Sequence, residues 1–89
     1  MRAKRVDENH GEIRDGIRSA GFTCIDTHDL GNGFPDLLCV AKSGKIVLME
    51  VKRPGERLNK CEKKFHAAFP VPIPVVETTI EAITILFAC

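Results

Sequence analysis

Three charged residues stand at the ends of two short apolar segments of the chain. Asp36 comes directly before the segment 37–40, and Glu50 and Lys52 come at the end of the segment 46–52. Two runs of branched apolar residues separated by a short turn with a glycine predict a β-hairpin. Antiparallel pairing then places Asp36 opposite the residue between Glu50 and Lys52, to within one position. One carboxylate from each strand and one ammonium group therefore meet at one end of the hairpin.

Two neighbouring carboxylates repel each other, and a divalent cation relieves that repulsion. Hard oxygen ligands of this kind suit Mg²⁺ or Mn²⁺, which also bind water and phosphate oxygens. Such an ion polarises a phosphate and lowers the pKa of a bound water, while Lys52 could orient that water or stabilise charge that develops on phosphorus. This is the chemistry of phosphodiester hydrolysis.

The same residues carry a resemblance to a known family. Pro35-Asp36, followed at hairpin distance by Glu50-Val51-Lys52, resembles the signature of the PD-(D/E)XK nucleases. The sequence segments 33–38 and 49–52 are similar to the corresponding segments of the VRR-NUC branch, in particular of its small stand-alone members carried by phages. The likeness covers nearly the whole chain and extends to Asp7-Glu8-Asn9, Leu58-Asn59 and Phe65-His66.

This resemblance implies an α-β-β-β-α-β core and the activity of a metal-dependent DNA endonuclease. It also implies a homodimer that acts on branched DNA, such as four-way (Holliday) junctions. Asp36 and Glu50 would bind Mg²⁺ or Mn²⁺ directly, the main-chain carbonyl of Val51 would add a ligand, and Lys52 would position the attacking water. An acid on the first helix would complete the site, and Glu12 is the matching position.

Two acids near this site keep alternative interpretations. Glu8, a turn before Glu12, is a weaker candidate for the same role, and the spacing Asn9-x-x-Glu12 also fits a capping box. Glu62 stands where the VRR-NUC pattern commonly has a glutamine that positions water or metal. Because Asn59-x-x-Glu62 is a second capping-box pattern, Glu62 is either a helix cap or a member of the site.

Basic residues gather after the motif. The segment 52–64 holds six basic and two acidic residues, whereas the whole chain has a net charge of only +1. Such a cluster predicts contacts with the DNA backbone, and a solvated helix face is the alternative. The candidates are Arg53, Arg57, Lys60, Lys63 and Lys64. Residues 1–6 are predicted to form a flexible basic arm, either frayed or in contact with DNA.

The chain of 89 residues predicts a single domain, 1–89, with an α/β fold and a mixed sheet of about four strands flanked by three helices. Both hairpin strands are apolar enough to be buried on both faces. Helices are expected from about Asn9 to Ala20, from Asn59 to Phe69 and after Thr78, with Ile80, Ile83, Leu86 and Phe87 facing the sheet. Strands are expected at 22–27, 37–40, 46–52 and 71–76.

Composition excludes several classes of protein. The sequence has no apolar run that could span a bilayer and no signal-peptide pattern, which predicts a soluble, intracellular protein, in the bacterial host cytoplasm if a phage encodes it. Four scattered cysteines without a CxxC pair predict reduced thiols, with Cys24, Cys39 and Cys61 in the core. No structural zinc is expected, because the cysteines and His10, His28 or His66 lack a zinc-site spacing.

Two other classes of function stay open. One is a catalytically inactive DNA-binding module on a nuclease fold, although intact acids and an intact lysine argue against a relic. The other is an interaction domain in which the hairpin motif arose by chance.

Overall fold

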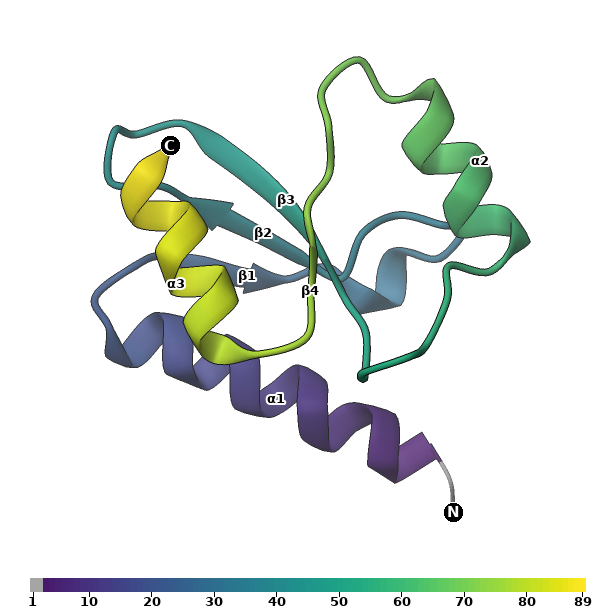
Figure 1. The fold of residues 1–89 in the computed structure, drawn as a ribbon, viewed down its shortest axis with the longest axis horizontal. Coiled ribbons are helices and arrows are strands. Elements are labelled where there is room, and N and C mark those ends of the chain that lie inside the picture. The colour runs from purple at the N-terminus through teal and green to yellow at the C-terminus, as the bar shows by residue number, and fades with distance from the viewer. Residues whose placement is uncertain (1–2) are drawn as a thin grey trace.

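The structure is a computed structural model that describes residues 3–89, and the side chains from Asn9 onward. Four strands and three helices follow one another in the order α-β-β-β-α-β-α, as predicted (Figure 1). The helices are α1 (Ala3–Ser19), α2 (Lys60–Ala68) and α3 (Thr79–Ala88), with a short 3₁₀ helix η1 (His28–Leu30). The strands are β1 (Cys24–Asp26), β2 (Leu37–Val40), β3 (Ile46–Val51) and β4 (Val75–Val76).

The sheet is mixed, with the strand order β1-β2-β3-β4. β2 pairs antiparallel with both β1 and β3, and β4 runs parallel to β3 at the edge. Leu37 pairs with Met49, so Asp36 lies at the level of Glu50, within one position of the predicted register. The hairpin turn closes with the amide of Ala41 donating to the carbonyl of Lys45 at 2.8 Å.

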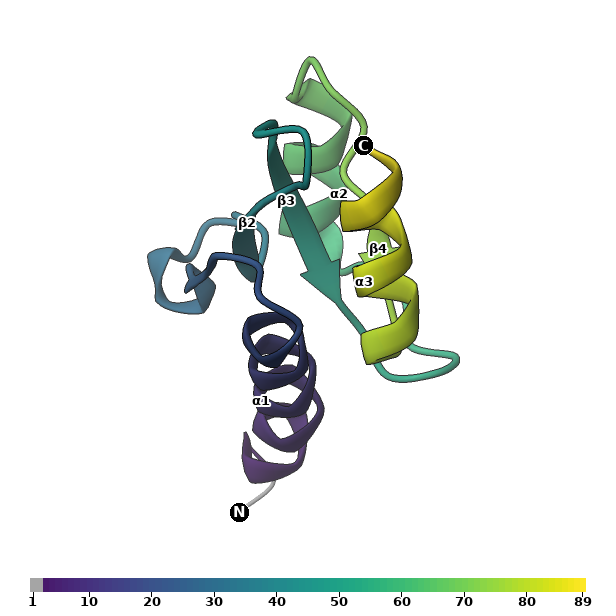
Figure 2. The ribbon, with the colours of Figure 1, turned by 90° about the vertical axis from the view of Figure 1, so that its left-hand side faces the viewer.

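The core lies between one face of the sheet and the pair α1 and α3. Ile17, Leu37, Met49 and Leu86 are fully buried there, and α1 and α3 also contact each other. Figure 2 shows α3 alongside the sheet, with α1 at its foot and α2 behind β3. α2 lies at the end of the sheet opposite the β2–β3 turn (Figure 1), and none of its residues is fully buried.

The other face of the hairpin differs from the prediction. Ile46 is 66% exposed, and Leu38 and Leu48 are only partly buried. Alternation along β3 puts Glu50 and Lys52 on this same face, where α2 covers them. The expected burial of both faces is therefore correct only for the face that α1 and α3 cover.

Several predicted details are wrong. α1 begins at Ala3 rather than near Asn9, so Asn9 is inside the helix and the capping box with Glu12 does not exist. Cys61 is exposed rather than part of the core. Ile80 and Phe87 are 75% and 55% exposed, and it is Ala82 and Leu86 that α3 buries.

Other predictions concern short segments. β4 is two residues long instead of six, and β1 is three. The capping boxes Asn59/Glu62 and Thr78/Glu81 are both formed, as predicted. Of the flexible basic arm predicted at 1–6, residues 1–2 lie outside the described residues, whereas residues 3–6 belong to α1. The side chain of Glu8 lies outside the side chains described. Among residues 3–89, no helix is long and apolar enough to cross a membrane.

The loop before β2 is fixed against α2 at a glycine. Gly33 has a positive φ of 80°, and a Cβ there would overlap the main-chain carbonyl of Cys61. Gly31, in the same loop, also has a positive φ of 72°, but a Cβ there would meet open space. Substitutions at the two glycines therefore distinguish the cost of backbone strain, which both share, from the cost of steric overlap, which only Gly33 has.

We expect Gly31→Ala to lower the free energy of unfolding by about 1–3 kcal/mol through backbone strain alone. Gly33→Ala should cost at least about 1 kcal/mol more, because the methyl group also displaces α2. Urea denaturation of the two variants measures this difference. Equal losses in the two variants would show that the loop and α2 are not in close contact.

Candidate active site

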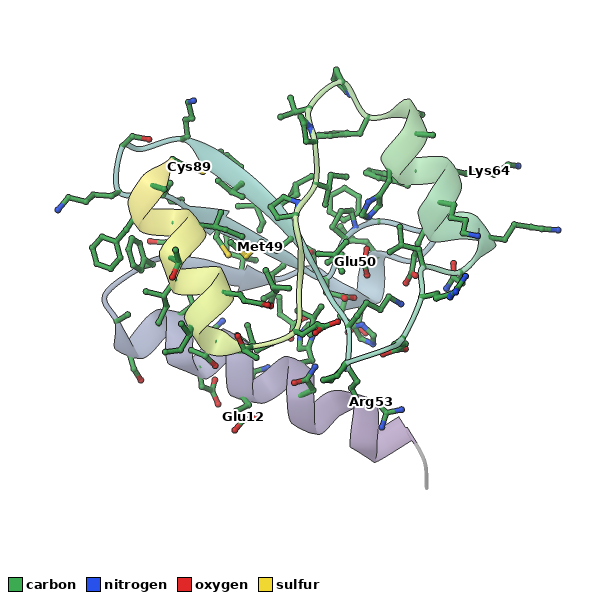
Figure 3. All side chains as sticks on the ribbon, viewed as in Figure 1. Glu12, Met49, Glu50, Arg53, Lys64 and Cys89 are labelled. Carbon is green, nitrogen blue, oxygen red and sulfur yellow. The ribbon has the colours of Figure 1, made fainter. Side chains whose placement is uncertain are left out.

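The hairpin end holds the predicted carboxylates together. The amide of Val51 donates a hydrogen bond to Asp36 Oδ2 at 2.9 Å, which fixes this carboxylate against β3. Glu50, next along β3, is fully buried, and Lys52 is only 7% exposed. Figure 3 shows Glu50 between the sheet and α2. The structure thus brings Asp36, Glu50 and Lys52 to one place, as the motif predicts.

Glu50 is a buried carboxyl group whose ionised form is disfavoured. Burial raises the pKa of Glu50, and the neighbouring carboxylates of Asp36 and Glu62 raise it further, to about 9. Its Oε1 lies 3.3 Å from Nε2 of His66, while Oε2 is buried without a hydrogen-bond partner among the described residues. A buried, unpartnered carboxylate oxygen beside another carboxylate is the environment that a cation stabilises.

His66 comes from α2 and faces the same carboxylate. Burial lowers the pKa of His66, and the charge of Lys52 lowers it further, against an opposing effect of Glu62. Near neutral pH the imidazole is therefore uncharged. It can hydrogen-bond to Glu50 but cannot neutralise a charge there.

Lys52 is held by α2 through an ion pair. Its Nζ lies 2.7 Å from Glu62 Oε1 and 3.9 Å from Glu56 Oε2. Burial alone would lower the pKa of Lys52, but the hydrogen bond to Glu62 and the attraction of nearby carboxylates outweigh burial and raise it. Lys52 thus stays an ammonium ion, which donates hydrogen bonds and does not act as a general base.

Glu62 caps α2, as one of the two interpretations predicts, and it also contacts Lys52. Its Oε1 accepts the amide hydrogen of Asn59 at 2.8 Å, which completes the capping box of α2, and the same atom pairs with Lys52. The helix cap and the site are therefore one structure. Any change at Glu62 affects the start of α2 and the lysine together.

Glu12 is not part of this cluster. It is exposed, and Figure 3 shows it on the side of α1 that points away from Glu50. α1 instead reaches the hairpin through Asn9, whose Nδ2 donates to the main-chain carbonyl of Lys52 at 3.2 Å. The expectation that Glu12 completes the metal site is therefore not met in this structure.

The basic candidates lie around the site on exposed positions. Arg53 and Lys64 extend into solvent from different elements (Figure 3), and the exposed set also contains Arg57, Lys60 and Lys63. Arg53 lies 4.0 Å from Glu56, and none of the others forms an ion pair with a described residue. Their positive charges are thus available to an anionic ligand.

The donors fit a hard divalent cation. Asp36 and Glu50 supply carboxylate oxygens, Glu50 Oε2 has no partner within residues 9–89, and the main-chain carbonyl of Val51 is a further oxygen at the same end of β3. Oxygen ligands in this number match what Mg²⁺ and Mn²⁺ take from proteins.

The sequence did not reveal the histidines around this site. His28 Nδ1 lies 3.3 Å from Asp36 Oδ1, and this hydrogen bond raises the pKa of His28. His10 is buried beside it, and His66 contacts Glu50. One usable signal existed for His10, which precedes Ile13 and Ile17 by three and seven residues and so shares their buried stripe.

No protein-family model matches this chain, and no curated protein or solved structure matches it either. The geometry of the site and the resemblance of its motif are therefore the features that indicate a function.

The buried carboxyl of Glu50 predicts a pH dependence of stability. The unfolded chain releases this proton near pH 4.5, whereas the folded protein keeps it up to about pH 9. Between these values the folded state binds more protons than the unfolded state, so the free energy of unfolding falls as pH rises through this window.

Glu50→Gln should remove this decline and make the metal-free protein more stable than wild type by about 1–3 kcal/mol at pH 8. Denaturant unfolding at several pH values measures the effect. The control is Glu12→Gln, an exposed site where the same substitution should change stability by less than about 0.5 kcal/mol. If the free energy of unfolding of Glu50→Gln fell with pH as steeply as that of wild type, Glu50 would not be the group responsible for the decline.

Proposed function

We propose that this protein is a divalent-metal-dependent DNA endonuclease that hydrolyses phosphodiester bonds. The observation that carries the proposal is the buried Glu50, with one unpartnered oxygen, beside Asp36 and the buried ammonium group of Lys52. A folded protein maintains such a costly arrangement when a ligand compensates for it.

Each group has a defined part in the reaction. Asp36, Glu50 and the carbonyl of Val51 would hold Mg²⁺ or Mn²⁺, which when bound supplies Lewis-acid activation of the phosphate and of a water. Lys52, held as an ammonium ion by Glu62, donates hydrogen bonds to the attacking water or to a phosphate oxygen. Asn9 fixes the main chain at Lys52, so the position from which the ammonium group extends is held in place.

Branched DNA is the proposed substrate class. The resemblance to stand-alone VRR-NUC proteins supports it, as does the lack of a recognisable reader of base edges in the sequence. A homodimer would place two sites on opposite strands of a four-way junction. Among the described residues, Ile46 on the outer face of the sheet and Val71 in the segment beside it are exposed, and a second copy could cover these apolar side chains.

An inactive DNA-binding module is the second candidate. The short Lys52–Glu62 contact favours it, because a carboxylate at 2.7 Å reduces the effect of the ammonium charge on a phosphate. Both candidates bind DNA, and only the first cleaves it in a metal-dependent way.

The deciding experiment compares a labelled four-way junction, a flap and a plain duplex of the same sequences, with Mg²⁺, Mn²⁺ or EDTA. Symmetric nicking of the junction alone supports the endonuclease and the dimer. Cleavage of all three substrates keeps the endonuclease and removes the junction preference. Binding without cleavage under every condition favours the inactive module.

Lys52→Ala should abolish measurable cleavage, a loss of at least about 100-fold, while DNA binding stays largely intact. The control is Lys42→Ala, an exposed lysine at the other end of the hairpin, which should cleave as wild type does. Cleavage rates and band-shift affinities of both variants check this. Retained cleavage in Lys52→Ala would remove Lys52 from the mechanism.

Replacing Lys60, Lys63 and Lys64 together with Gln should weaken DNA binding on all substrates. The slope of log affinity against log salt should become shallower by about 0.9 for each lost phosphate contact. Affinities measured at several salt concentrations give this slope, with Lys42→Gln as the control. An unchanged slope would show that this face of α2 does not bind the DNA backbone.

A further inference from the structure

Two histidines from different elements meet at the second oxygen of Asp36. His10 comes from α1 and His28 from η1, and their rings are 5.3 Å apart between centroids. One ring nitrogen of each histidine and one carboxylate oxygen of Asp36 all lie within 4.8 Å of one another. His28 Nδ1 is already 3.3 Å from Asp36 Oδ1. None of these contacts involves Glu50 or Lys52.

The fold buries the ring of His10 and fixes the main chain that carries His28. His10 is 6% exposed because it shares the buried stripe of α1 with Ile13 and Ile17. His28 follows β1, and its amide donates to Asp26 Oδ1 at 3.1 Å. Thr27 lies between Asp26 and His28 in the sequence. Its Oγ1 donates to the carbonyl of Pro35 at 2.8 Å, which connects the start of η1 to the residue before Asp36.

A buried ring nitrogen of His10 lacks a hydrogen bond within the described part of the chain. This atom, Nε2, lies 3.0 Å from Asp26 Oδ2, an ion-pair contact without the geometry of a hydrogen bond, and no hydrogen-bond partner lies among the described residues. Buried polar atoms without a hydrogen bond are few in native proteins, and a bound ion is one explanation for such an atom. Only two occur among the described side chains, and the other is Glu50 Oε2.

The chemistry of these three donors favours a transition metal. Two imidazole nitrogens with one carboxylate form a mixed nitrogen and oxygen set that suits Mn²⁺, Fe²⁺, Co²⁺ or Zn²⁺, whereas Mg²⁺ prefers oxygen alone. Ligands about 2.1 Å from one ion lie about 3–4 Å from each other, so the observed separations close with small side-chain rotations. The carboxylate of Asp26 adds negative charge beside the cluster.

We propose that His10, His28 and Asp36 bind a first-row transition-metal ion. This site differs in its donors from the oxygen site at Asp36 and Glu50, and it shares only Asp36 with it. The inference goes beyond the proposed nuclease activity, because it requires neither DNA nor cleavage.

Mn²⁺ alone is the probe, because its electron spin resonance reports both free ion and directly bound nitrogen. Titration of the full chain should remove the free-ion signal, and electron spin echo modulation should show coupling to ¹⁴N of imidazole. His28→Gln and His10→Gln should each lower Mn²⁺ affinity at least tenfold and reduce the nitrogen coupling. His28 is exposed, so its variant should fold even if His10→Gln does not, as circular dichroism will show.

The control is His66→Gln, which changes the third and last histidine of the chain and should leave the nitrogen coupling intact. Loss of the coupling in His66→Gln, or its persistence in both other variants, would overturn the assignment. Absence of any nitrogen coupling in wild type would also overturn it.

Glu50→Gln separates this proposal from the nuclease proposal. The variant should keep the nitrogen coupling, because Glu50 is not a ligand of the histidine site. Nitrogen coupling in a protein that cleaves no DNA would support the metal site and reject the nuclease. Cleavage without nitrogen coupling would do the reverse.

Discussion

The hydrogen bond from the Val51 amide to Asp36 is the constraint on which the site depends. It fixes one carboxylate at the end of the hairpin while the strand register fixes Glu50 beside it. The two acids cannot separate without breaking the pairing of β2 with β3. The sheet therefore holds the two acids close together, and this closeness disfavours ionisation of Glu50.

Contacts from three directions surround the two acids and Lys52. α2 contributes His66 to Glu50 and Glu62 to Lys52. The loop before β2 contributes His28 to Asp36, and its packing at Gly33 keeps it against α2. α1 contributes Asn9 to the main chain of Lys52. Elements far apart in sequence thus converge on the one end of the hairpin where the two acids meet.

Local patterns were sufficient to predict much of this protein. Strand alternation and the glycine turn gave the hairpin and its register, and the Asn59/Glu62 and Thr78/Glu81 spacings gave the caps of α2 and α3. Asp36, Glu50 and Lys52 could be brought together because hairpin pairing is itself local. The fold class followed from the order of these elements.

What failed depends on contacts between distant segments. Glu12 and Asn9 are three residues apart on α1, and only the angle at which the helix meets the sheet decides that Asn9 faces Lys52. The sequence likewise could not show that Ile80 and Phe87 point outward, since α3 is apolar nearly all round and no stripe marks its inner side. The three histidines were undervalued for the same reason.

α2 completes the site, yet it buries no residue fully. Contacts that attach α2 to the rest of the protein include the edge-to-face packing of Phe34 with Phe65 and the polar contacts of Glu62 and His66. Segments with few buried apolar contacts open locally at a free energy well below that of global unfolding. Transient departure of this helix would uncover Glu50 and Lys52 while the sheet stays folded. Glu50, which is fully buried in the folded structure, is therefore expected to become accessible when α2 opens locally.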